Sequence, residues 1–293
     1  MAERQRVLRI GLLTPLEELD PRCVGEILTE TACRQIFETP FQMKNHQGHA
    51  KPWLFATPFS QRSGDGEPAV QAIVRSDVVF SDGLPMTAGD VATCLREDPQ
   101  LGCHTIRADG ERLVIEGVSD PREIEVALCQ TRTAVWRSTP VGLVGTGPFR
   151  LCRPRGLHEQ VGQETVELEP NPCYPRTPEL DRICFEVFPP DGDGVPTALE
   201  AALRDGSVDL AFGIGKARAD GLSGFVRQCT PGLSIALLFF NTARPPFDQQ
   251  RLRLAVAKVL DRSQLAHQLY ERPFAFVATS LLPPELGRYW DKL

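Results

Sequence analysis

The sequence predicts an α/β fold in which helices connect neighbouring parallel strands. The clearest support is a strand–helix–strand unit, with an apolar run at 183–188, a helical stretch at 197–203 and a second apolar run at 208–212. A helix that joins two strands of one sheet in this way sets them parallel, with a right-handed connection. The amino-terminal part has the same alternation, with a buried strand expected at 7–13 and a helix at 24–38.

The segment at 70–91 joins a strand, a tight turn and a capped helix. Apolar residues alternate with polar ones along 70–80, which is typical of a strand. Asp82 and Gly83 tolerate positive φ and predict a turn at its end. Thr87 is placed as the N-cap of a following helix, and Asp90 can return the hydrogen bond as a capping box.

The other elements follow in chain order. Strands are expected at 112–118, 149–153 and 164–169, because each is a short apolar run bounded by turn residues. The apolar run at 234–241 predicts a further strand, and the region at 248–269 is expected to form helices.

Composition limits the function classes. The chain has 293 residues, of which 42% are hydrophobic and 24% charged, as in a globular protein with a sizeable core. Its net charge of −6 argues against a nucleic-acid partner, which requires a basic surface. The apolar run at 235–240 has only the length of a strand, so we expect no membrane span.

The cysteines and the start of the chain bear on location. Nine cysteines are present, and their odd number leaves at least one thiol free in the monomer. No apolar stretch of signal-peptide length precedes the first strand. We therefore expect a reducing, cytoplasmic location. The alternative is a periplasmic or extracellular location, which applies if a leader has been removed.

No motif predicts catalysis, a metal site or a cofactor. Gly213 and Gly215 follow a strand, but residue 218 is Arg where a dinucleotide-binding loop has its third glycine. His46 and His49 have metal-like spacing, but their polar surroundings favour a solvated turn. We expect no catalytic residue, no metal ligand and no cofactor, and therefore not an enzyme.

Several segments carry a family resemblance, in the same order along the chain. The segment at 75–91 contains F-S-D-G-L-P-M-T-A-G-D-V, and G-T-G-P-F stands at 145–149. Further matching segments lie at 8–21, 34–38, 51–56, 169–174, 241–247 and 251–265. Together they resemble family 5 of the extracellular solute-binding proteins, the receptors of peptide, dipeptide and nickel ABC importers. The resemblance covers nearly all of this chain but only the first part of the family's length.

The resemblance implies a periplasmic-binding-protein-like fold of type II, in the peptide-binding-protein cluster. Mixed sheets, an inserted α/β subdomain and a truncated second lobe are expected. The implied boundaries are 1–42 and 145–233 for the first lobe, 43–144 for the inserted subdomain and 234–293 for the start of the second lobe.

The resemblance also implies where a ligand binds. Counting from the L-D-P run, Gly25, Glu26 and Ile27 occupy the positions that present backbone groups to an extended ligand. Glu26 is able to face a ligand amine; the alternative is a carboxylate that complements the start of a helix. Phe240 and Asn241 lie at the family's lobe crossover. Their alternatives are sheet core for Phe240 and a turn for Asn241.

Three functions follow from this reading. The first is a solute-binding protein that holds a peptide-like or small-molecule ligand between two lobes without catalysis, with an ABC permease or a second polypeptide as partner. The second is a cytoplasmic ligand-sensing or protein-interaction module derived from the same fold, for which a homo-oligomer is open. The third is an enzyme recruited on the same cleft, which no residue supports.

Overall fold

The structure, a computed structural model, describes residues 6–43, 49–62, 67–140, 142–153, 165–189, 191, 196–212, 214, 222–226, 228, 237–269 and 277. The chain forms two compact units, Met1–Gly213 (unit 1) and Ile214–Leu293 (unit 2). Helices and strands alternate in unit 1, so the predicted α/β class is confirmed. No helix in the described ranges has the length and hydropathy needed to cross a bilayer.

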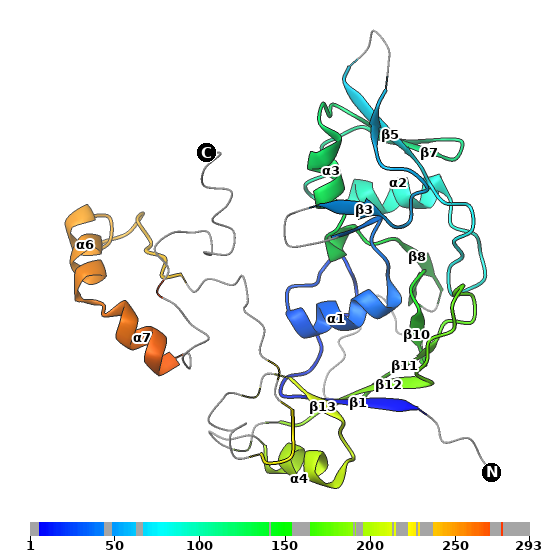
Figure 1. The fold of residues 1–293 in the computed structure, drawn as a ribbon. Coiled ribbons are helices and arrows are strands. Elements are labelled where there is room, and N and C mark those ends of the chain that lie inside the picture. The colour runs from blue at the N-terminus through cyan, green and yellow to red at the C-terminus, as the bar shows by residue number, and fades with distance from the viewer. Residues whose placement is uncertain are drawn as a thin grey trace. The chain divides into compact units, whose positions relative to one another are not determined.

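A five-stranded mixed sheet forms the base of unit 1 (Figure 1). Its strands, in spatial order, are β10 (Phe149–Leu151), β11 (Val166–Pro170), β12 (Arg182–Val187), β1 (Val7–Leu12) and β13 (Leu210–Ala211). The predicted strand–helix–strand unit is present, but β1 lies between its two strands. Ile10 of β1 pairs in parallel with Phe185 of β12 on one side and with Leu210 of β13 on the other.

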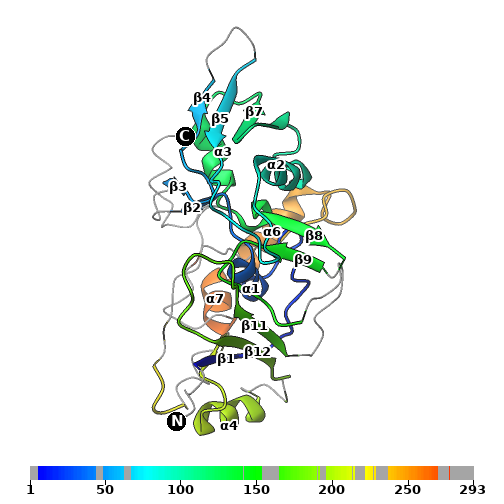
Figure 2. The same ribbon diagram turned by 90° about the vertical axis from the view of Figure 1, so that its right-hand side faces the viewer.

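Helices α1 (Ile27–Ile36) and α4 (Thr197–Asp205) cover opposite faces of this sheet in both ribbon views (Figures 1 and 2). Helix α4 approaches β1 closely at Gly11, where an added Cβ would lie 2.5 Å from Leu199 Cδ1. Helix α1 buries Ala32, Cys33 and Ile36 in the core. It begins three residues later than expected, because Glu26 is its N-cap and has extended backbone angles.

The predicted inserted region contains an antiparallel sheet with the order β4 (Ser60–Gln61), β5 (Ala69–Ile73), β7 (Arg112–Glu116) and β6 (Ile106–Asp109). Helix α2 (Ala88–Glu97) packs on β6 and β7, and α3 (Pro121–Ala127) packs on a hairpin of β2 (Phe41–Met43) and β3 (Ala50–Pro52). A second hairpin is formed by β8 (Trp136–Thr139) and β9 (Gly142–Gly145), which follow the short 3-10 helix η1 (Thr131–Thr133).

The turn and capped helix predicted after the first strand of this region are confirmed. Gly83 has φ of +89°. The Thr87 hydroxyl accepts a hydrogen bond from the Asp90 N–H (3.2 Å), and the Thr87 N–H donates to the Asp90 carboxylate (2.8 Å). The strand itself is shorter than expected and ends at Ile73.

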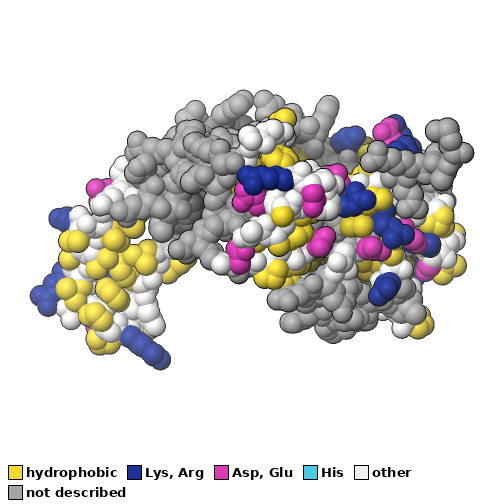
Figure 3. All heavy atoms as spheres, turned by 90° about the horizontal axis from the view of Figure 1, so that it is seen from below, with side chains coloured by type: hydrophobic (Ala, Val, Ile, Leu, Met, Phe, Trp, Pro, Cys, Tyr) yellow, Lys and Arg dark blue, Asp and Glu magenta, His cyan; other side chains and the backbone are white. Residues whose placement is uncertain are grey.

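Unit 2 contains α6 (Gln250–Val259) and α7 (Arg262–Leu269), as the sequence predicts for 248–269. No residue of α6 is buried. Figure 3 shows hydrophobic side chains grouped on the surface of this unit, at the left of the view. The strand predicted at 234–241 is not found over 237–241, because no described strand pairs with these residues; 234–236 lie outside the described ranges.

Segments that carry the family resemblance meet at the carboxyl end of α1. Gly145 and Gly147 lie against its last turn, where an added Cβ would come within 2.1 Å of the Ile36 carbonyl oxygen and 2.5 Å of the Gln35 carbonyl oxygen respectively. The Gly147 N–H donates to the Ile36 carbonyl (2.9 Å). The Asn171 side chain, which is buried, donates to the Gly147 carbonyl (2.8 Å). A side chain at either glycine would therefore push the two segments apart.

The Glu38 carboxylate makes hydrogen bonds at the same junction. Oε1 accepts hydrogen bonds from the Trp53 indole N–H (2.7 Å) and the Tyr174 hydroxyl (3.1 Å). Burial raises the pKa of Glu38 above its ordinary value, although these hydrogen bonds oppose the shift. Burial and the Glu38 charge together raise the pKa of Tyr174 to about 12. One carboxylate thus joins α1, the chain after β3 and the loop after β11.

Replacing Glu38 with Gln tests this junction through its pH dependence. Because the pKa of Glu38 is raised, the folded state binds this proton more tightly than the unfolded state. Its stabilising contribution is therefore complete below the ordinary pKa and is lost as the pH rises through the raised pKa. Glutamine keeps the acceptor and carries no charge. We expect the free energy of unfolding of Glu38→Gln, relative to the unmodified protein, to increase from about pH 4 to about pH 7.

Urea unfolding across this pH range makes the measurement, with the exposed Glu186→Gln as the control. A relative stability that is flat with pH, or equal in the two variants, would contradict the assignment.

Candidate functional site

The segment predicted to contact a ligand follows a turn built on Asp20. The Asp20 side chain is only 2% exposed, and its carboxylate accepts hydrogen bonds from the Arg22 backbone N–H (2.9 Å) and from Arg22 Nε (2.9 Å). The Cys23 N–H donates to the Asp20 carbonyl (3.1 Å). A buried carboxylate is costly unless it is paired, so these contacts fix the turn and the direction in which the chain leaves it.

Arg22 also reaches the region predicted as the inserted subdomain. Its Nη1 donates to Glu97 at the end of α2 (2.8 Å), and its Cζ lies 4.4 Å from the ring centroid of Trp136 in β8. The sequence reasoning missed all three of these residues. Glu97 lies 75 residues from Arg22 in the chain, and no local pattern connects them.

Val24 and Gly25 lie between this turn and α1. Within the described ranges, their backbone N–H and C=O groups make no hydrogen bond. Gly25 is exposed, and the atom nearest to an added Cβ would be Glu17 Oε2, at 3.7 Å. Two consecutive residues therefore offer unpaired donors and acceptors at the surface, with no side chain on Gly25 to keep another backbone away.

Glu26 ends the segment as the N-cap of α1. Its backbone is extended (φ −125°, ψ 140°), and its carboxylate accepts hydrogen bonds from the N–H groups of Leu28 (2.8 Å) and Thr29 (2.9 Å). The buried Thr29 hydroxyl also accepts from the Glu17 N–H (2.9 Å). The Glu26 side chain thus takes the helix-capping role left open as the alternative, and Ile27 beside it is 73% exposed.

Phe240 and Asn241, the other predicted contacts, belong to unit 2. The Phe240 ring packs on Phe247 with centroids 4.9 Å apart. The Asn241 side-chain oxygen accepts from the Ala243 N–H (3.1 Å), which forms the turn given as its alternative. Gly25, Glu26 and Ile27 therefore belong to unit 1, and Phe240 and Asn241 belong to unit 2.

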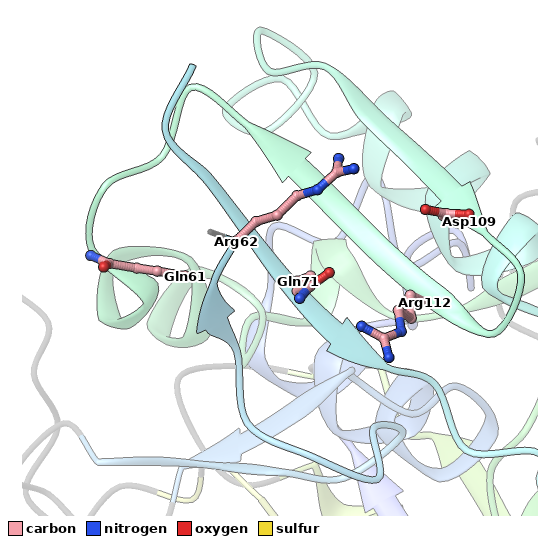
Figure 4. Close-up of a pocket in the computed structure, with 5 residues that line it drawn as sticks. All are labelled: Gln61, Arg62, Gln71, Asp109 and Arg112. Atoms are coloured by element: carbon pink, nitrogen blue, oxygen red, sulfur yellow. The ribbon is translucent and has the colours of Figure 1, made fainter. Parts of the chain in front are cut away.

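A separate polar depression of about 450 Å³ lies on the antiparallel sheet of unit 1 (Figure 4). The Arg62 side chain extends from the end of β4 toward β7 in this view. The lining residues are Gln61, Arg62, Gln71, Asp109 and Arg112. They come from the strands and their immediate ends, and none is among the predicted contacts. An open polar surface without apolar walls buries little of a ligand, so this depression is the weaker candidate.

The described residues lack a group of metal ligands, and two of their buried cysteines are held in the thiol form. They contain no group of three or more His, Cys, Asp or Glu side chains placed to hold a metal ion. The eight described cysteines are free thiols. Burial raises the pKa of Cys94 to about 12 and that of Cys129 to about 11, which keeps both in the unreactive thiol form. His46, Gly213 and Gly215 lie outside the described residues.

Comparison with known proteins identifies a family that the chain matches. Residues 120–293 match the family described as bacterial extracellular solute-binding proteins, family 5 Middle. A curated relative, heme-binding protein A of Haemophilus influenzae, is 27% identical over 157 residues, which are 51% of this chain and 26% of the relative. The family's description favours the extracellular alternative, and the expected cytoplasmic location gains no support from it.

Solved structures of similar fold agree. The periplasmic binding protein DppA from Helicobacter pylori, in complex with the peptide STSA, has a TM-score of 0.76 at 18% identity over 95% of this chain and 60% of its own. MoaA from Agrobacterium tumefaciens, with mannopinic acid, has a TM-score of 0.71 at 20% identity over 92% of this chain and 58% of its own. NikA from Staphylococcus aureus, with Ni(L-His)2, has a TM-score of 0.70 at 19% identity over 96% of this chain and 59% of its own. The chain thus spans about three fifths of the length of these structures.

Replacing Glu26 with Ala tests whether its side chain serves the helix. Loss of an N-cap acceptor leaves the first N–H groups of α1 without their partners, so we expect the free energy of unfolding to fall by about 1 kcal/mol. The neighbouring Ile27→Ser variant, on an exposed side chain, should stay within about 0.5 kcal/mol. Urea unfolding distinguishes them; equal effects in the two variants would refute the capping role.

Proposed function

The chain belongs to the bacterial extracellular solute-binding proteins, family 5, and from this we propose that it binds a peptide-like ligand, without catalysis, along the backbone of Val24, Gly25 and Glu26. The observation that carries the proposal is a short segment in which Val24 and the exposed Gly25 have unpaired backbone groups. It lies between the buried Asp20 of the turn and the Glu26 cap of α1. The family consists of binding proteins, which supports a non-catalytic role at the family level.

The chemistry of the segment suits a main-chain ligand. Val24 and Gly25 each leave an N–H and a C=O unpaired, and an extended peptide can pair with such groups as an added strand. Such pairing depends on the ligand's backbone and leaves its side chains free to vary. The exposed Ile27 lies next to this segment and offers an apolar contact for one ligand side chain.

The relatives support binding but differ in what they hold. DppA is in complex with the peptide STSA, MoaA with mannopinic acid and NikA with Ni(L-His)2. Of these ligand classes, the peptide fits best with a site made of backbone donors and acceptors. Phe240 and Asn241 stay in the proposal as contacts supported by the family resemblance, and an ABC permease is the proposed partner.

Titration calorimetry with the peptide Ser-Thr-Ser-Ala tests the proposal. We expect saturable binding, weakened by about 5-fold to 100-fold when the central amide nitrogens of the peptide are methylated, because each lost donor leaves a carbonyl of the protein unpaired. The Gly25→Pro variant, which removes one N–H from the protein, should lose affinity for the unmodified peptide by a similar factor. Equal affinity for both peptides, or no binding, would refute a backbone site.

A second function is favoured by unit 2. Helix α6 has no buried residue, and Leu238, Phe239 and Val259 are exposed by 64%, 82% and 84%. An apolar surface of this kind suits contact with another polypeptide, as in a protein-interaction module. Sedimentation velocity distinguishes the solute-binding function from the protein-interaction module. The module requires a stable oligomer or complex, whereas a receptor binds its ligand as a monomer.

A further inference from the structure

We propose that Arg22 is a positioning residue that holds the Val24–Gly25 segment in one conformation and couples it to α2 and β8. The ligand-binding half of this proposal rests on the proposed function; the positioning half does not.

The guanidinium of Arg22 binds two carboxylates from separate elements at once. Nε and Nη2 donate to Asp20, at 2.9 Å and 2.5 Å, and Nη1 donates to Glu97 at 2.8 Å. Every nitrogen of the group is therefore engaged within the protein. These contacts make Arg22 a link between the turn and α2.

The surroundings of Arg22 make the link stiff. Its side chain is 27% exposed while that of Asp20 is 2% exposed, so the pair is partly shielded from water. The guanidinium also lies over the Trp136 ring, at 4.4 Å from Cζ to the centroid. A planar, stacked group with fixed donors loses little conformational freedom when it binds two carboxylates, which lysine cannot reproduce.

The segment beyond the turn depends on this link. Val24 and Gly25 make no backbone hydrogen bond of their own within the described ranges, so their conformation depends on their two flanks and on the Val24 side chain, which packs against the core. One flank is the Asp20–Arg22 turn, and the other is the Glu26 cap of α1. If the first flank is released, the segment must be ordered when a ligand binds, and that cost lowers affinity.

Nuclear magnetic resonance order parameters of the Val24 and Gly25 amides test the positioning role without a ligand. In the unmodified protein we expect values near 0.85, typical of rigid backbone. In Arg22→Lys and in Glu97→Ala we expect values below about 0.6, while amides of β1 and β12 stay rigid. The matched control is Arg204→Ala, which removes the exposed Arg204–Glu200 pair on α4 and should leave Val24 and Gly25 unchanged.

Arg22→Lys keeps a charge beside Asp20, so it is chosen over a neutral variant that would leave a buried carboxylate unpaired and threaten folding. Rigid amides at Val24 and Gly25 in a folded Arg22→Lys and a folded Glu97→Ala protein would overturn the proposal. Low order parameters already present in the unmodified protein would also overturn it, because the segment would not be held at all.

Affinity for the peptide Ser-Thr-Ser-Ala tests the coupling to the site. We expect a loss of about fivefold to tenfold in both variants and none in Arg204→Ala. If the unmodified protein does not bind this peptide, the proposed function fails and the order parameters still decide the positioning role. If the variants become mobile at Val24 and Gly25 but bind with unchanged affinity, the coupling of Arg22 to ligand binding is refuted.

Discussion

The junction at the end of α1 is the constraint on which the rest of unit 1 depends. The Glu38 carboxylate is bound there by Trp53 and Tyr174, from segments on either side of it in the chain. Gly145 and Gly147 come so close to the same helix end that no side chain fits. The resemblance segments that meet here, 34–38, 51–56, 145–149 and 169–174, therefore have a structural role: they join α1 to the hairpins and the sheet.

This arrangement leaves the backbone groups of Val24 and Gly25 without hydrogen-bond partners in the described part of the protein. A hydrogen-bonded carboxylate lies at each end of this segment, the buried Asp20 in the turn and the half-buried Glu26 at the cap, and Val24 and Gly25 between them do not pair with the protein backbone. A site made of backbone groups gives affinity for an extended chain but little choice among side chains. Selectivity must then come from neighbouring side chains such as Ile27.

Local features of the fold could be predicted from the sequence, and long-range ones could not. The Thr87–Asp90 capping box depends on residues three apart, and the structure has it as predicted. The place of β1 between β12 and β13 has no local signature, and neither does the contact of Arg22 with Glu97. The run at 237–241 has the composition of a strand, but a strand also needs a paired neighbour, and none is found among the described strands.

The most direct test of the account is to map amide chemical shifts while the peptide Ser-Thr-Ser-Ala is added to the labelled protein. The account predicts that the largest changes fall on Val24, Gly25 and Ile27, which belong to the proposed binding segment. It predicts little change at Gln71 and Arg112, in the polar depression of the antiparallel sheet. Changes centred on that depression, with Val24 and Gly25 unmoved, would contradict it.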